Sequence, residues 1–141
     1  MVSGGSRGYW VKRLDELPLV PTDDPDDFDW YPIQHHLGFS AFGVNGFGGD
    51  AGTHLVAEHD ETESGQEELY IVVEGTVRFT LAGETVQAPA VSFVALPDPA
   101  VRRAAVALED GTLLLAIGAP AGSGFRTTWG AEHFEQVSRA E

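Results

Sequence analysis

Short hydrophobic segments of four to eight residues follow one another from residue 37 to residue 117, and this spacing constrains the fold more than any other feature. The segments are rich in Val, Ile, Leu, Thr and Phe, and Gly, Pro or Asp lies between most of them. Such punctuation is typical of a β-sandwich or barrel and argues against a sheet built from alternating strands and helices. We therefore predict an all-β protein with strands at residues 37–44, 54–59, 68–73, 76–81, 85–88, 91–96, 101–108 and 112–117.

The two ends of the chain have a different character, and they divide it into three parts. Residues 1–36 are predicted to be an N-terminal arm that packs on the barrel, residues 37–118 the barrel, and residues 119–141 a C-terminal segment with a short helix. Within the arm, residues 1–9 are expected to be disordered, and the Pro- and Asp-rich stretch 21–33 carries Trp30 and Tyr31 as anchors. The helix is placed at residues 129–137, docked on the outside of the barrel.

Charge and residue usage exclude several classes of function. The formal net charge of −14 disfavours binding to nucleic acid or to an anionic membrane, because both would repel the chain. The absence of cysteine rules out disulfides, thiolate metal sites and a Cys nucleophile. No apolar run has the ~20 residues of a membrane span, and residues 1–7 lack the apolar core of a signal peptide, so we expect a cytoplasmic protein.

The strand at residues 68–73 introduces polar chemistry into this apolar framework. Because successive strand residues face opposite ways, Glu68, Tyr70 and Val72 share one face, and the other face is also apolar. We therefore expect the strand to be buried on both sides, with Glu68 at the mouth or inside of a barrel. A buried carboxylate requires a partner, and the adjacent Arg102 and Arg103 can supply one, since one of them must point inward.

Two sets of residues in this region resemble the motifs of the cupin superfamily. In the first motif, two His separated by one residue precede a Glu, and a Gly follows. Glu68 and Gly75 match its second half, while His59-Asp60-Glu61 resembles the paired His with Glu in place of the second one. The second motif corresponds to Val91, Pro97, Pro99, Arg102 and Val106, where only the first proline is kept and Arg102 stands at the position of a His.

The resemblance covers about residues 37–118 and implies a cupin-type jelly-roll β-barrel like those of small single-domain bacterial cupins. In that family three His and the Glu bind a divalent metal ion. Carried over by position, the possible ligands are His59, Glu61 and Glu68, because Arg102 offers no lone pair. The alternative is a metal-free barrel in which Arg102 forms a salt bridge with Glu68, and we expect no cofactor there.

Three hypotheses of function remain open at this point. The first is a small-molecule-binding protein whose apolar pocket is anchored by Glu68 and Arg102 and which acts as a metal-independent isomerase or cyclase on an anionic metabolite, with Glu68 or His59 as base. The second is a metal-dependent dioxygenase, isomerase or decarboxylase. The third is a non-enzymatic interaction module, and a homodimer is expected because sheet edges need cover. The expected pocket-lining residues are Tyr70, Phe79, Phe93 and Trp30.

Overall fold

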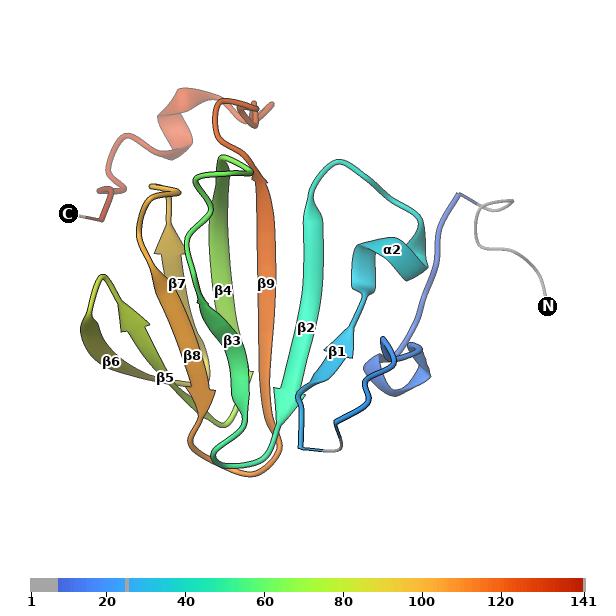
Figure 1. The fold of residues 1–141 in the computed structure, drawn as a ribbon. Coiled ribbons are helices and arrows are strands. Elements are labelled where there is room, and N and C mark those ends of the chain that lie inside the picture. Colours follow the sequence, from blue (N-terminus) through green and yellow to red (C-terminus); the bar gives the residue numbers. More distant parts are fainter. Residues whose placement is uncertain (1–7, 25, 141) are drawn as a thin grey trace.

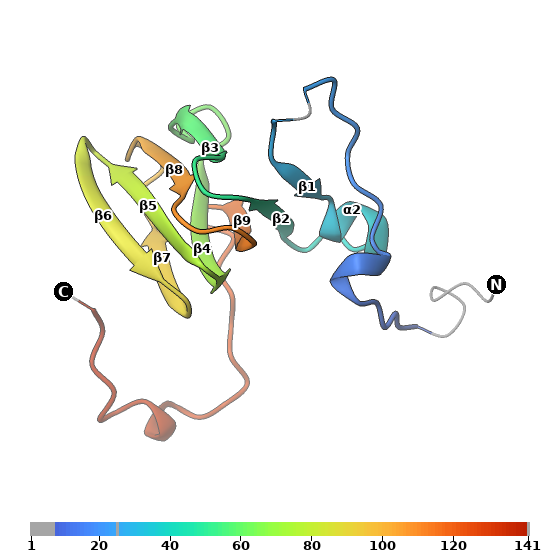
Figure 2. The same ribbon diagram turned by 90° about the horizontal axis from the view of Figure 1, so that it is seen from below.

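The structure, a computed structural model, describes residues 8–24 and 26–140, so most of the segment predicted to be disordered lies outside the described residues. The described residues form two antiparallel sheets that face each other (Figures 1 and 2). The five-stranded sheet has the order β1 (Asp29–Tyr31), β2 (Gly43–Gly49), β9 (Thr112–Pro120), β4 (Gln66–Glu74) and β7 (Ser92–Leu96). The four-stranded sheet has the order β3 (His54–His59), β8 (Arg103–Ala107), β5 (Thr76–Leu81) and β6 (Glu84–Pro89).

The core lies between the two sheets and follows from the period-two alternation of the strands. Val72 and Leu114 face it from the five-stranded sheet, and Val77 and Phe79 face it from the four-stranded sheet. All four side chains are at most 1% exposed. The predicted all-β jelly roll is thus confirmed, with two facing sheets whose edges are not closed into a continuous barrel.

The turn between β4 and β5 shows why the Glu74-Gly75 pair stands where it does. Gly75 has φ of +76°, a conformation that residues with a Cβ rarely adopt. A Cβ at this position would also run into the side chain of Thr112 on β9. The predicted turn is therefore confirmed, and only glycine fits both its backbone and its packing.

The first predicted strand was misplaced. Residues 37–44 were expected to form the strand, but the structure has helix α2 (Ile33–Leu37) and then strand β2, which begins at Gly43 and runs over the glycines. Two of these glycines are explained by close packing, because a Cβ at Gly46 would lie 3.2 Å from the Tyr31 Cβ and a Cβ at Gly49 would lie 2.7 Å from the Thr53 side chain. Glycine has a low intrinsic propensity for strands, but here β2 is held as a strand by its pairing with β1 on one side and β9 on the other.

The C-terminal segment is less helical than expected. The described part of the N-terminal arm contains the 3₁₀ turn η1 (Leu14–Glu16), strand β1 and most of helix α2, whereas the described part of the C-terminal segment has only the 3₁₀ turn η2 (Ala131–His133). The helix predicted at residues 129–137 is therefore wrong in extent, and it does not dock on the barrel, because residues 120–140 are all exposed. A short helix without tertiary contacts is marginal in water, which accounts for the difference.

Candidate functional site

A cavity of about 540 Å³ opens between the two sheets at the end where β4 and β2 begin. One part of its wall is aromatic and aliphatic, and the other is polar, with side chains from β3, β4 and the loop that joins them. Among the residues predicted to act in the pocket, His59, Glu61, Glu68, Tyr70 and Trp30 line this cavity. The two sheets therefore bring together residues that lie up to 40 positions apart in the sequence.

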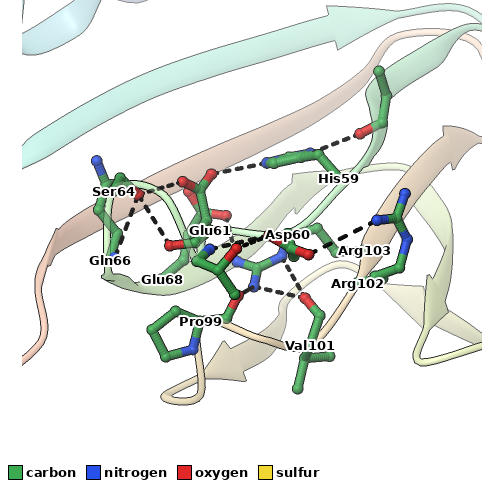
Figure 3. Close-up of polar contacts among 12 residues, drawn as sticks. His59, Asp60, Glu61, Ser64, Gln66, Glu68, Pro99, Val101, Arg102 and Arg103 are labelled. Atoms are coloured by element: carbon green, nitrogen blue, oxygen red, sulfur yellow. Dashed lines mark hydrogen bonds and ion pairs between the residues drawn. The ribbon is translucent and has the colours of Figure 1, made fainter.

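His59 and Glu61 form a hydrogen-bonded pair at the polar end (Figure 3). The His59 Nε2 atom lies 2.8 Å from Glu61 Oε1, and the Nδ1 atom lies 2.7 Å from the backbone carbonyl of Ala57. Ser64 donates to the second Glu61 oxygen at 2.6 Å. Both ring nitrogens of His59 thus face acceptors, an arrangement that requires a cation: either a second proton on the ring or a metal ion at Nε2.

The ionisation of Glu61 reflects these contacts. Burial by itself would raise the pKa of Glu61, but hydrogen bonds from Ser64 and His59, together with the positive charges of His59 and Arg103, outweigh it and lower the pKa. Glu61 therefore carries its negative charge throughout the neutral range. Since its side chain is 18% exposed, this charge faces the cavity rather than the bulk solvent.

Glu68 is held by Arg103 at the base of the site, as Figure 3 shows. Arg103 Nη1 donates to Glu68 Oε1 at 3.1 Å, and the other guanidinium nitrogens donate to the carbonyls of Val101 and Pro99. Arg103 is fully buried, and its donors are directed to protein acceptors. Arg103 balances the charge of Glu68 from the side away from the cavity, and it does not line the cavity itself.

Arg102, which was expected to face Glu68, lies on the outside instead. Its guanidinium is 55% exposed and stands 3.8 Å from both Glu58 and Asp60. The reason is the alternation of β8, which buries Arg103, Ala105 and Ala107 and leaves the residue before Arg103 outside. The predicted guanidinium–carboxylate pair exists, but the residue that makes it is one position further along the chain.

The aromatic part of the wall also differs from the prediction. Trp30 lies there together with Phe28 and Phe47, and Trp30 Nε1 donates to Asn45 Oδ1 at 2.9 Å. Phe28 and Phe47 pack edge to face with ring centroids 5.3 Å apart. Both were missed, although the alternation of Asn45 and Phe47 with glycines in β2 carries a period-two signal.

Two residues expected in the pocket lie elsewhere. Phe79 is 1% exposed and belongs to the core, where its ring is 5.6 Å from that of Tyr70. Phe93 is 67% exposed and lies on the opposite, outer face of the five-stranded sheet, because it pairs with Ile71 and not with the inward Tyr70. Neither side chain lines the cavity.

Tyr70 makes the stability of the protein sensitive to alkaline pH. Burial, and then the charge of the neighbouring Glu68, raise the pKa of Tyr70 well above its ordinary value of 10.0. The native protein therefore keeps the phenol proton at pH values at which the unfolded chain loses it. The contribution of Tyr70 to the free energy of unfolding is fully present below pH 10 and is lost as the pH rises further. We expect the tyrosinate absorbance of Tyr70 to appear only with alkaline unfolding, and a Tyr70→Phe variant to show a shallower loss of stability above pH 10; titration of Tyr70 near pH 10 in the folded protein would contradict this.

The donor atoms at the polar end also suit a metal ion. One atom each from His59, Glu61 and Glu68 can be chosen so that all lie within 4.8 Å of one another, and this is the only such group among the residues that the structure describes. When Nδ1 donates its proton to the Ala57 carbonyl, the lone pair of the ring lies on Nε2, the atom that faces Glu61. One imidazole and two carboxylates fit a hard or borderline divalent cation better than a soft one.

A second, larger cavity of about 670 Å³ lies at the other end of β2 and is acidic, with Asp26, Asp27, Asp29, Asp50 and Glu74 in its wall. Its carboxylates form no group of three convergent ligands among the described residues. The backbone N–H of Gly111, in the turn between β8 and β9, donates a hydrogen bond to Asp50 Oδ1 at 3.0 Å. We therefore regard the cavity with His59 as the functional site.

Comparison with known proteins connects this geometry to one fold. No protein-family model matches the chain, and no curated protein matches it. Solved structures do. A cupin protein from Bacteroides fragilis is 20% identical over 86% of this chain and 98% of its own, with a TM-score of 0.61.

Two further structures have names that refer to particular proteins. KdgF from Halomonas sp. is 18% identical over 75% of this chain and 90% of its own, with a TM-score of 0.60. A sugar phosphate isomerase of the cupin superfamily from Silicibacter pomeroyi is 19% identical over 76% of this chain and 73% of its own, with a TM-score of 0.63. This chain therefore has the cupin fold, as its motifs indicated.

Proposed function

We propose that this cupin-fold protein binds a neutral, polyhydroxylated small molecule, such as a sugar, in the cavity between its sheets. The observation that carries the proposal is the composition of the wall. Phe28, Trp30 and Phe47 offer apolar ring surfaces, and Glu61 and Glu68 offer carboxylate oxygens that accept hydrogen bonds from hydroxyls. A sugar ring presents both an apolar C–H face and a rim of hydroxyls, so it matches both parts.

The charge of the wall supports a neutral ligand over an anionic one. Arg102 lies outside the site, and Arg103 is sealed behind Glu68, so the cation on which the expectation of an anionic ligand rested does not reach the cavity. The described residues that line the cavity include no Lys or Arg. A phosphate or carboxylate would face the carboxylates of Glu61 and Glu68, and like charges at close range repel. On this basis we expect sugars without a phosphate group.

The same end of the cavity offers groups for proton transfer. Under the proposal, Glu68 would accept a proton from a hydroxyl or an acidic C–H of the bound molecule, and the protonated His59 ring would return one from Nε2. Glu61 would hold the His59 ring in place and stabilise its protonated form through the 2.8 Å contact. An isomerase-type reaction needs this kind of proton movement, and it is the activity that we would test first once a ligand is found.

The aromatic wall gives a direct test of binding. We expect isothermal titration calorimetry to detect binding of one or more neutral hexoses and markedly weaker binding of the corresponding hexose phosphates. A Trp30→Ala variant should bind at least about fivefold more weakly, because it loses a ring contact worth about 1 kcal/mol or more. Trp30 is 39% exposed, so its removal should leave the fold intact.

Trp129 provides the matched control, because it is 69% exposed in the C-terminal segment and does not line the cavity. We expect Trp129→Ala to bind the hexose as the wild-type protein does. The proposal is wrong if no neutral hexose binds, if hexose phosphates bind more tightly than hexoses, or if the two tryptophan variants bind equally.

A second candidate function is that of a metal-dependent enzyme, and the two acceptors around the His59 ring favour it. His59, Glu61 and Glu68 would hold a divalent cation, which would supply Lewis-acid polarisation of a substrate oxygen. In that case the chain's own residues orient the site: the Ala57 carbonyl fixes the ring of His59, Ser64 holds Glu61, and Arg103 holds Glu68.

Metal analysis of protein purified without an affinity tag tests this candidate. We expect near-stoichiometric Mn²⁺, Fe²⁺ or Zn²⁺, a higher melting temperature with the added ion, and loss of both effects in His59→Gln. His54→Gln is the control, since His54 is an exposed histidine on the same strand. Absence of bound metal together with no thermal stabilisation by added divalent ions would rule the candidate out.

A further inference from the structure

A smaller cavity lies beside the cavity with His59, at the same end of the protein. Its volume is about 310 Å³, and its wall comes from residues 39–42, which join α2 to β2, and from the adjoining ends of β4 and β9. Figure 1 shows the segment between α2 and β2 reaching the end of the five-stranded sheet at which β9 finishes. We call this space the side cavity. Its volume is at the lower end of the range of small-molecule pockets.

The two cavities share part of their walls. Four residues line both of them: Gln34, Gly43, Gln66 and Gly118. Gly43 is paired with Gly118 across β2 and β9, and Gly118 is paired with Glu68 across β9 and β4. Because directly paired residues share a face of the sheet, the two glycines lie beside Glu68 on the cavity side. The floor between the cavities is therefore a strip of backbone without side chains.

The backbone does not explain why these two positions are glycine. Neither Gly43 nor Gly118 has a positive φ, so residues with a Cβ could adopt the same conformation. Among the described residues, a Cβ at Gly43 would meet only the Gly118 carbonyl, at 3.6 Å, which is an ordinary contact. A Cβ at Gly118 would lie 2.8 Å from Gln66 Oε1 and would displace that amide. Glycine inside a strand often marks a place where a ligand approaches the backbone closely, and this strip has that character.

Two side-chain amides stand at the junction of the cavities. Gln34 Oε1 accepts a hydrogen bond from the Val44 backbone N–H at 2.8 Å, and the Gln34 NH₂ group has no partner among the described residues. Gln66 donates its backbone N–H to Ser64, whereas its side-chain amide makes no hydrogen bond within the described part of the chain. The oxygen that joins two sugar units carries no proton, so it needs a donor. The amides can supply donors that the carboxylates of the neighbouring wall cannot.

The far side of the side cavity is aromatic and uncharged. The rings of Phe39 and Phe42 have centroids 5.2 Å apart, and these side chains are 37% and 44% exposed. Phe39 is fixed at the end of α2, because its backbone N–H donates to the Gln34 carbonyl at 3.2 Å. None of the described residues in this wall carries a charge, although the chain has a formal net charge of −14. Ring surfaces without charges suit the C–H face of a second neutral sugar unit.

We propose that the ligand is a neutral disaccharide or longer oligosaccharide, with one sugar unit in the cavity with His59 and the next in the side cavity. The bond between the units would cross the strip formed by Gly43 and Gly118, beside the amides of Gln34 and Gln66. This ligand class rests on the sugar ligand proposed above and extends it by one unit.

Isothermal titration calorimetry with matched sugars tests the second unit. The probes are glucose, galactose and mannose, the methyl glycoside of each, and the disaccharides maltose, cellobiose, lactose and mannobiose. We expect at least one disaccharide to bind at least about tenfold more tightly than its constituent hexoses, because its second ring gains the surface of Phe39 and Phe42. The methyl glycosides carry the linking oxygen without a second ring, and they should bind as the free hexoses do.

Variants of the aromatic wall show where the gain arises. Phe39→Ala combined with Phe42→Ala should abolish the preference for the disaccharide and leave hexose binding unchanged, since neither ring lines the cavity with His59. Phe125→Ala is the control, because it removes a ring that is 95% exposed and outside both cavities. Trp30→Ala should weaken hexose and disaccharide binding by similar factors. If the double variant does not fold, Phe42→Ala alone should reduce the preference about threefold.

The outcomes separate this ligand class from the proposed function. If hexoses bind and no disaccharide binds more tightly, the second unit is wrong and the sugar-binding function still stands. The second unit is also wrong if the Phe39 and Phe42 variants keep the full preference, or if they weaken hexose and disaccharide binding equally. Failure of every hexose to bind contradicts the proposed function itself, and the disaccharide falls with it.

Discussion

Arg103→Met should lower the free energy of unfolding by about 3–5 kcal/mol, the cost of removing one partner of a buried ion pair. Arg103 is fully buried and donates to Glu68 and to the carbonyls of Val101 and Pro99. Methionine fills much of the space but leaves Glu68, which is 11% exposed, without its cation. The measurement is urea denaturation followed by circular dichroism at neutral pH.

Arg102→Met is the matched control, because it makes the same change one residue away. Its guanidinium is 55% exposed and stands 3.8 Å from the nearest carboxylates, so we expect a loss of no more than about 1 kcal/mol. Combining Arg103→Met with Glu68→Met should recover part of the lost stability, since the double variant leaves no buried charge unpaired. Equal effects of the two arginine variants would contradict the position of Arg103.

Phe79→Ala is expected to have an effect of similar size for a different reason. Phe79 is 1% exposed in the core between the sheets, and replacing a buried Phe with Ala typically costs about 3–5 kcal/mol through lost burial and the cavity left behind. The side chain does not line the ligand cavity, so any hexose binding should persist wherever the variant is folded. Thermal and urea unfolding measure the loss of stability, and calorimetry on the folded protein measures hexose binding.

Phe42 is the comparison for this substitution, because its side chain is 44% exposed in the loop before β2. Phe42→Ala should cost less than about 1 kcal/mol. If Phe79→Ala were as mild as Phe42→Ala, or if it abolished hexose binding in a protein that is still folded, Phe79 would belong to the pocket as the sequence first suggested.

The sequence was sufficient for the fold class and for most strands, and the physical reason is the period-two alternation. Strands such as β4, β5 and β9 combine alternating burial with β-branched residues, so their positions were predicted closely. The strand β2 was missed because it is rich in glycine, and the reasons for Gly46 and Gly49 are the Tyr31 and Thr53 side chains that pack on them. Contacts of that kind depend on the tertiary structure and leave no local signal.

The site was predictable in its residue types but not in its geometry. The convergence of His59, Glu61 and Glu68 followed from the motif spacing, and their donor atoms do lie close together. The choice between Arg102 and Arg103 depended on where β8 begins, and strand boundaries are the weakest part of any sequence analysis. Because the buried arginine is Arg103 and not Arg102, the cavity that was expected to bind an anion is instead lined by hydrogen-bond acceptors.

The place of β9 in the five-stranded sheet has a consequence for how the protein is made. This strand lies between β2 and β4, although the ribosome synthesises it after all the others. Until Thr112–Pro120 has emerged, β2 and β4 each expose an unpaired edge, and the sheet cannot close around its cavity. Folding of this domain must therefore follow synthesis rather than accompany it, and a nascent chain stalled before residue 112 should be a substrate for chaperones and proteases.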